Sequence, residues 1–275
     1  MTPDNNKERM ETIYRHLWSH RNAELLAQLD QSLNPRSPEM LYAVAAGLGI
    51  NASYTVLDAG SGLGIYSCGL ASRFGCRVIG LDIAKNNLEQ ARANAREEGL
   101  TKRVTFQLGK VQSLPYDDAV FDLVWCRDML VHVRDLRQAL REFARVLKPN
   151  GKVLIHTTFA TELLEPKEAA YLYESLDLIP ENMSPAYFEE AFKAADLQIR
   201  TRESIGSEWL EYSEEQGQHS SKELLRVARM RRSKERLVAE FGQEAYDVIL
   251  AVSLWHIYLL IGKLSSTIYT LRKSA

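Results

Sequence analysis

Short apolar runs alternate with longer amphipathic stretches through the first half of the chain. Five runs rich in β-prone residues, at 54–57, 76–82, 103–108, 119–127 and 152–159, predict buried strands. Between them, residues 63–74, 84–98 and 135–147 place apolar side chains at helical spacing. This alternation of strands and helices predicts an α/β fold built around a parallel sheet with helices on both faces.

Further helical patterns lie on either side of that region. Residues 8–29 and 39–47 precede the first strand, and residues 207–261 separate a strand at 197–205 from a last strand at 265–271. We therefore expect an N-terminal helical cover (1–50), a core (51–206), a helical insertion that serves as a substrate lid (207–262) and a final core strand (263–275). Both additions are placed to cover a cleft.

Composition narrows the class of protein. The chain has 275 residues, 45% of them hydrophobic, and a net charge of −2, which gives no general attraction to nucleic acid or anionic membranes. Its three cysteines lack metal-site spacing and are expected to be core thiols. The polar N-terminus is unlike a signal peptide, and the longest apolar run, at 250–261, is too short to span a bilayer. We expect a cytoplasmic protein that binds neither membrane nor nucleic acid, with no metal; whether the helical additions make a homo-oligomer stays open.

The first strand leads into a turn with glycines at alternate positions. Asp58 ends the strand and is followed by Gly60, Gly62 and Gly64, whereas a dinucleotide turn would carry its third glycine at Ile65. A carboxylate at this turn repels a pyrophosphate and suits a ligand that carries positive charge. S-adenosylmethionine, with an ammonium and a sulfonium group, is such a ligand.

This stretch resembles the first motif of the class I S-adenosylmethionine-dependent methyltransferases. Phe-Asp-Leu-Val at 121–124 and Leu-Lys-Pro-Asn-Gly at 147–151 are also typical of that family, so the resemblance covers roughly Tyr54 to Phe159. It implies a Rossmann-like, seven-stranded sheet and an in-line transfer of the methyl group to a small molecule. Bacterial enzymes of natural-product, quinone and sterol-like pathways are the most similar in pattern.

The resemblance also implies roles for residues at the strand ends. Asp82 would accept both ribose hydroxyl protons, although it could merely cap the following helix, and Ile83 would lie against adenine. Lys110 stands where the family usually has an aspartate that binds the adenine amino group, and a lysine cannot accept that bond. The Val111 N–H and the Gln112 side chain would replace it.

Three more candidates complete the predicted cofactor site. Arg127 would sit near the methionine part, and Ser61 belongs to the glycine turn. Tyr14 is either a packing residue of an amphipathic helix or part of a lid against the sulfonium. The full set is Asp58, Gly60, Ser61, Gly62, Gly64, Asp82, Ile83, Val111, Gln112, Arg127 and Tyr14.

Proton transfer is needed only if the acceptor must lose a proton. His132, His156 and Glu208 are the candidate catalytic residues, and each has a plainer alternative: a packed core histidine for the first two and a solvated acidic helix face for the third. A basic run at 222–236 indicates either an exposed helix with paired charges or a contact with RNA or a phosphorylated substrate.

Three functions stay open at this stage. The first is methyl transfer to a carbon, oxygen or nitrogen of a small molecule. The second is an RNA or protein methyltransferase, which the net charge of −2 and the sequence Cys-Arg-Asp-Met at 126–129 disfavour. The third is a regulatory protein that binds S-adenosylmethionine without turning it over, which Lys110 favours.

Overall fold

A computed structural model describes residues 3–273 of the chain. Within these residues it contains twelve α-helices, two short 3₁₀-helices and seven strands. The chain separates into two compact units, which divide between Arg36 and Ser37. Each unit is described by itself.

The smaller unit is helical. It consists of α1 (Pro3–Leu17) and α2 (His20–Leu29), where the sequence pattern predicts one continuous helix. Ser19 interrupts it because its side chain accepts a hydrogen bond from the N–H of Asn22 and so caps the second helix. Tyr14 lies on α1.

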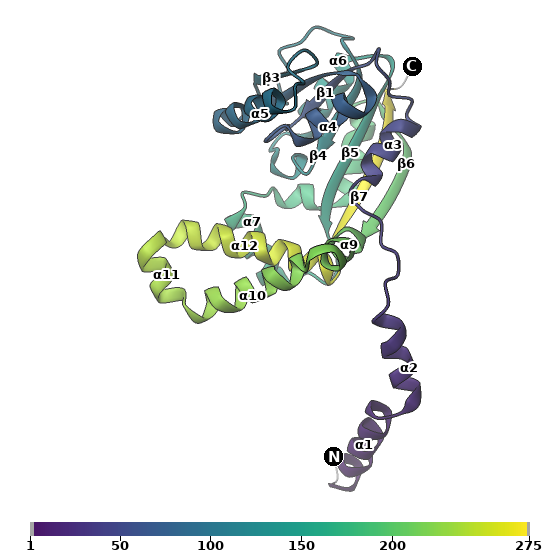
Figure 1. Cartoon of the computed structure of the whole chain (residues 1–275), viewed down its shortest axis with the longest axis vertical. Coiled ribbons are helices and arrows are strands. Elements are labelled where there is room, and N and C mark those ends of the chain that lie inside the picture. The colour runs from purple at the N-terminus through teal and green to yellow at the C-terminus, as the bar shows by residue number, and fades with distance from the viewer. Residues whose placement is uncertain (1–2, 274–275) are drawn as a thin grey trace. The chain divides into compact units, whose positions relative to one another are not determined.

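The larger unit is organised around a seven-stranded sheet (Figure 1). Its strands are β1 (Thr55–Ala59), β2 (Arg77–Asp82), β3 (Val104–Leu108), β4 (Phe121–Arg127), β5 (Leu147–Ala160), β6 (Leu197–Gly206) and β7 (Leu264–Lys273). Their order is β3-β2-β1-β4-β5-β7-β6, and β7 runs antiparallel to both of its neighbours. The predicted α/β sheet is confirmed, and its strand order reverses between β1 and β4, which is where ligands bind in open α/β sheets.

Helices cover both faces of this sheet. On one face, α3 (Met40–Gly47), α4 (Ile65–Phe74) and α5 (Lys85–Glu97) share a buried cluster that includes Leu41, Leu70 and Leu88. On the other, α6 (Leu136–Val146) and α8 (Pro185–Ala194) bury Phe143 and Phe188. Helix α3 therefore packs with the sheet, so the compact units divide at residue 36, before the predicted domain boundary at residue 50.

A third cluster lies in a helical lobe. The lobe contains α7 (Pro166–Ser175), α9 (Glu208–Gly217), α10 (His219–Arg232), α11 (Lys234–Phe241) and α12 (Gln243–Leu260). Two 3₁₀-helices are short: η1 (Leu130–His132) follows β4, and η2 (Pro180–Met183) follows α7. Helices α9–α12 form the expected insertion between β6 and β7, and the lobe lies beyond the carboxyl ends of β4 and β5 (Figure 1).

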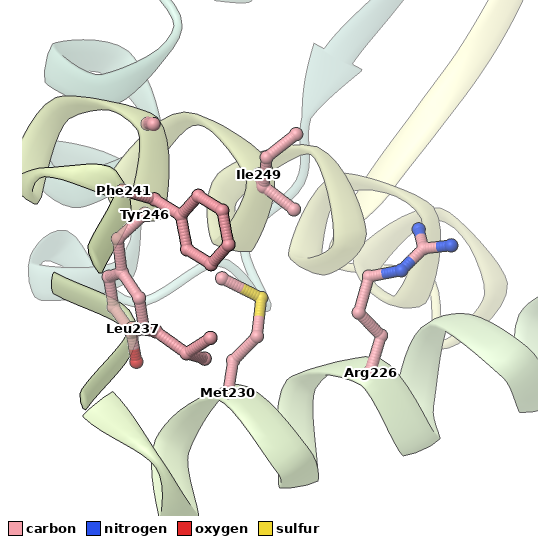
Figure 2. A pocket seen from close by; sticks show the side chains of 7 residues that line it. Arg226, Met230, Leu237, Phe241, Tyr246 and Ile249 are labelled. Atoms are coloured by element: carbon pink, nitrogen blue, oxygen red, sulfur yellow. The ribbon is translucent and has the colours of Figure 1, made fainter. Parts of the chain in front are cut away.

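The lobe has a hollow of its own between α10, α11 and α12. It measures about 290 Å³, and its walls are almost wholly apolar, with Met230, Phe241 and Ile249 facing one another and Arg226 at one side (Figure 2). None of the predicted site residues lines this hollow. Across residues 3–273, no helix combines the length and the apolar character that crossing a membrane would require.

Candidate active site

The glycine turn after β1 is a close-packed structure with one open position. Gly60, Gly62 and Gly64 all have positive φ, at 80°, 51° and 76°, a conformation that favours glycine. A Cβ on Gly60 would lie 2.5 Å from Cγ of Met129, and one on Gly64 would lie 2.6 Å from Cζ of Phe106. A Cβ on Gly62 would have nothing within 4 Å. Packing therefore requires the outer two glycines, whereas the middle one borders the space where a ligand would approach.

Asp58 places a carboxyl group beneath this turn. It is only 2% exposed, and the Ser67 hydroxyl donates a hydrogen bond of 2.5 Å to its Oδ2. Burial raises the pKa of Asp58 to about 6, and the charge of Asp82 adds to that effect, while the bond from Ser67 and the charge of Arg127 oppose it. A cationic ligand at the turn would favour the ionised form.

Asp82 ties the turn to the next strand and helix. Its Oδ2 accepts a hydrogen bond of 2.9 Å from the Gly62 N–H, and its Oδ1 accepts one of 2.8 Å from the Ala84 N–H. The carboxylate thus anchors the start of α5, as the capping alternative expects. The Asn87 side chain also donates to Oδ1, over 3.4 Å, so Oδ2 is the oxygen that keeps a lone pair for a hydroxyl group. Ile83, next to it, is 72% exposed. Both the capping and the ribose roles are compatible with this geometry.

The loop after β3 adjoins Asp82. The Gly109 N–H donates to the Asp82 carbonyl oxygen over 3.0 Å, which holds the loop against the end of β2. The side chain of Val111 is buried in the core, and the carbonyl of Gln112 accepts a hydrogen bond from the Gln138 side chain. Lys110 is exposed and forms an isolated bridge with Ser113. The adenine roles of Val111 and Gln112 stay predictions.

Arg127 ends β4 at the point where the strand order reverses. Its guanidinium lies over the ring of Tyr66, 4.6 Å from the centroid, and its Nε is 3.4 Å from Oδ2 of Asp128. Tyr66 is in the first turn of α4, directly after the glycine turn. Sequence reasoning missed Tyr66, although its place immediately after Gly64 and Ile65 was a usable signal.

The next residue, Asp128, joins Arg127 to His156. Nδ1 of His156 is 3.1 Å from Oδ1 of Asp128, and the Thr158 hydroxyl is 3.5 Å from the same oxygen. Burial alone would raise the pKa of Asp128, but the neighbouring His156 and Arg127 outweigh it and hold that pKa below its usual range. Asp128 has a φ of 51°, so the chain turns sharply at this carboxylate.

The three candidate bases lie in different surroundings. His156 is 2% exposed and stacks on Trp209 of α9, with ring centroids 4.4 Å apart. His132 is exposed on η1, and its Nδ1 is 3.1 Å from the carbonyl oxygen of Asp177. Glu208 is half-buried at the start of α9. The structure therefore gathers His156 with the Arg127–Asp128 pair, and no sequence pattern pointed to Trp209.

Tyr14 belongs to the smaller unit, so its proposed contact with the cofactor stays a prediction. The other predicted cofactor residues are all in the larger unit, at the ends of β1, β2, β3 and β4. Among residues 3–273, no three His, Cys, Asp or Glu side chains are grouped so that they could hold a metal ion.

Comparison with known sequences identifies the central region. Residues 57–155 match the family model described as a methyltransferase domain. The chain is 41% identical over 120 residues to methyltransferase GfsG of Streptomyces halstedii, an alignment that covers 44% of this chain and 42% of that protein. It is 32% identical over 154 residues to the probable chloroplastic tocopherol O-methyltransferase of Oryza sativa subsp. japonica, covering 56% and 42%. The chain thus spans about two fifths of the length of these relatives.

Solved structures share the fold over most of the chain. A putative sarcosine dimethylglycine methyltransferase from Galdieria sulphuraria superimposes with a TM-score of 0.66 at 21% identity, covering 86% of this chain and 84% of that one. The [4+2]-cyclase SpnF does so with a TM-score of 0.67 at 23% identity, covering 86% and 81%. At such identities the likeness shows the fold alone, and a cyclase among these structures means that the reaction must be argued from the site.

Proposed function

From the match of residues 57–155 to a methyltransferase domain, we propose that the chain is a class I S-adenosylmethionine-dependent methyltransferase and that it transfers a methyl group to a small molecule. The acceptor atom is a carbon, oxygen or nitrogen, and we place the reaction in secondary metabolism in the cytoplasm. Relatives named for methylation of small molecules support this substrate class.

The glycine turn is the main support for this proposal, because the polar groups around it match the polar groups of the cofactor. The buried carboxyl group of Asp58 lies under a turn that is open only at Gly62. Within the part of the chain that the structure describes, the buried Ser61 hydroxyl of this turn makes no hydrogen bond, and Nε of Arg127 has the Asp128 carboxylate 3.4 Å away. A ligand with an ammonium, a carboxylate and hydroxyl groups would satisfy such a set.

Each residue then has a defined task. We propose that Asp58 faces the ammonium, that Asp82 accepts ribose hydroxyl protons and that Ile83 covers one face of adenine. Val111, Gln112 and Arg127 would complete the site, Arg127 towards the methionine carboxylate. When bound, S-adenosylmethionine supplies an electrophilic methyl group. Most of what the protein adds is positioning of the two reactants and exclusion of water.

Calorimetry with S-adenosylhomocysteine, S-adenosylmethionine and NAD tests the cofactor assignment. We expect both sulfur compounds to bind and NAD not to bind, since Ile65 removes the third glycine of the dinucleotide pattern. Tight binding of NAD, or no binding of either sulfur compound, would contradict the proposal.

Labelled cofactor identifies the acceptor class. Incubation of the protein with methyl-labelled S-adenosylmethionine and a cell extract should place the label in small organic products. Label in RNA or protein would support the macromolecular alternative, and binding without transfer would support the regulatory one. The four-part domain division and assembly of a homo-oligomer through the helical additions stay predictions; gel filtration of the full chain checks the latter.

A further inference from the structure

A second hollow lies directly beside the Asp128 carboxylate. It measures about 310 Å³ and lies between η1, the segment after α7 and helix α12 of the insertion. Its apolar walls come from Val131, Leu176, Leu178, Val252 and Trp255, and its polar groups are Asp128, His132 and His256. Because Asp128 directly follows β4, this hollow opens at the reversal point of the strand order, next to the proposed cofactor site.

The two histidines that line the hollow use the same ring nitrogen to contact the backbone. Nδ1 of His132 is 3.1 Å from the Asp177 carbonyl oxygen, and Nδ1 of His256 is 2.8 Å from that of Val252. A carbonyl oxygen only accepts hydrogen bonds, so each Nδ1 must carry the proton and donate it. In the neutral imidazole, Nε2 is then the unprotonated nitrogen, and it is the atom left to meet a ligand. The hollow therefore holds two hydrogen-bond acceptors.

The charges around the hollow define what it would accept. No lysine or arginine is among the residues that line it, so nothing there matches an anionic group. Its one carboxylate, Asp128, is already within bonding distance of His156 and Thr158 and close to Arg127. An apolar molecule with a neutral hydroxyl group fits these walls and acceptors better than a cation or an anion does.

Building on the proposed function, we propose that this hollow binds the methyl acceptor and that the acceptor is an apolar molecule with a hydroxyl group. His256, the less exposed of the two histidines, receives the hydrogen bond of the hydroxyl group and takes its proton. In the methyl transfer, the hydroxyl oxygen of the acceptor forms a C–O bond to the methyl group, and the electron pair of the broken C–S bond stays on sulfur. The hydroxyl proton moves to Nε2 of His256.

Binding probes test this without knowledge of the natural acceptor. The protein is saturated with S-adenosylhomocysteine and titrated with 2-naphthol and with 2-methoxynaphthalene, which cannot donate a hydrogen bond. We expect 2-naphthol to bind at least about fivefold more tightly, the scale of one hydrogen bond. His256→Leu should abolish that preference, whereas His219→Leu, which removes an imidazole with a similar Nδ1 bond on α10, should leave it unchanged.

A pair of valines on α12 locates the binding site. Val248 and Val252 are both 37% exposed, but only Val252 lines the hollow. Val252→Trp should therefore weaken 2-naphthol binding, and Val248→Trp should not. Equal effects of the two substitutions, or equal affinity for the two probes, would overturn the assignment.

The proton-transfer step has a spectroscopic test. We expect 4-nitrophenol bound near pH 6.5 to shift towards its coloured, ionised form in the parent protein. His256→Gln, which can accept a hydrogen bond but not a proton, should keep the binding and lose the shift. The remaining titratable groups of the hollow are His132 and Asp128, so His132→Gln is the control and should retain the shift.

Failure of the two proposals can be told apart. If S-adenosylhomocysteine does not bind, the cofactor assignment is wrong whatever the probes do. If it binds but the probes show no hydroxyl preference, or bind without any change in His256→Leu, the methyltransferase proposal stands and the acceptor site does not.

Discussion

The indole ring of Trp209 lies flat on the imidazole of His156, with centroids 4.4 Å apart and planes inclined by 19°. One ring belongs to α9 of the insertion and the other to β5 of the sheet. Together with the 3.1 Å contact between His156 and Asp128, this stack leaves His156 almost without solvent access. A small molecule would reach that imidazole only if α9 moved away.

The first prediction concerns the strength of this stack. A double-mutant cycle with His156→Ala and Trp209→Ala should give a coupling energy of about 0.5–1.5 kcal/mol, the range for aromatic pairs. Urea unfolding of the four proteins measures it. His156→Ala paired with Tyr246→Ala, a buried ring in the helical lobe, is the control and should be additive. Additivity of His156 with Trp209 would mean that the two rings do not stabilise each other.

The second prediction separates the two roles considered for His156. Because the ring is buried, we expect His156→Gln to change turnover of the identified acceptor by less than about tenfold. His256→Gln should cost about 10²–10⁴-fold, the usual contribution of a general base. Initial rates at saturating cofactor decide between them. A loss of that size in His156→Gln, with unchanged melting temperature and cofactor affinity, would restore His156 as the base.

The third prediction is a pH-dependent gain in stability. The unfolded chain releases the Asp58 proton near pH 4, whereas the native protein releases it near pH 6. The free energy of unfolding therefore falls as the pH rises through that interval. Asp58→Asn removes the buried charge and can still accept the bond from Ser67, so it should gain roughly 1–3 kcal/mol at pH 7.5 and almost nothing at pH 4.

Asp58→Asn should also weaken binding of the cofactor. Loss of the charge that faces the ammonium is expected to reduce affinity for S-adenosylmethionine by roughly 1–3 kcal/mol. Asp82→Ala should do so to a similar extent, because it removes the proposed ribose acceptor and frees the turn. Calorimetry at pH 7.5 checks both, and unchanged affinity in both variants would refute the assignment of these strand ends.

The fourth prediction uses the contrast within the glycine turn. Gly60→Ala combines a positive φ with a contact of 2.5 Å to Met129 and should cost roughly 2–4 kcal/mol of stability. Gly62→Ala has only the conformational strain and should cost about 1–2 kcal/mol, but its methyl group enters the ligand space and should reduce cofactor affinity. Gly99→Ala has comparable strain with nothing within 4 Å and should leave that affinity unchanged.

The fifth prediction concerns the helical additions. Residues 207–261 and 8–29 are expected to form a cover over the carboxyl ends of the strands that becomes ordered on ligand binding. Hydrogen exchange should show these segments gaining protection when cofactor and acceptor are both present. Protection confined to the glycine turn and the loop after Leu108 would contradict the cover.

Local chemistry made most of the fold predictable. The helix expected at 135–147 is α6, which Asp135 caps by accepting a bond from the Gln138 N–H, and all the expected strands are confirmed. The start of β5 was expected at Lys152, but the strand begins at Leu147, which pairs with Phe121 of β4. That extension depends on a neighbouring strand, which a local pattern of proline and glycine does not describe.

The cofactor half of the site could be predicted from the order of the strands along the chain, whereas the acceptor half could not. Asp58 and Asp82 end consecutive strands, so their convergence could be predicted from parallel pairing alone. Trp209 and His256 reach the site from an insertion whose helices could fold back in many directions. Only packing within the helical lobe determines the direction in which these helices fold back. The hydrophobic periodicity of the sequence does not predict that direction.

Strand β7 lies between β5 and β6, and β6 pairs with no other strand within residues 3–273. During synthesis, the whole insertion leaves the ribosome after β6 and before β7. Until Leu264–Lys273 emerges, one edge of β5 and both edges of β6 have no partner, and such edges invite aggregation. A substitution that slows folding of the insertion should therefore lower the yield of folded protein, even where it touches neither the cofactor nor the acceptor.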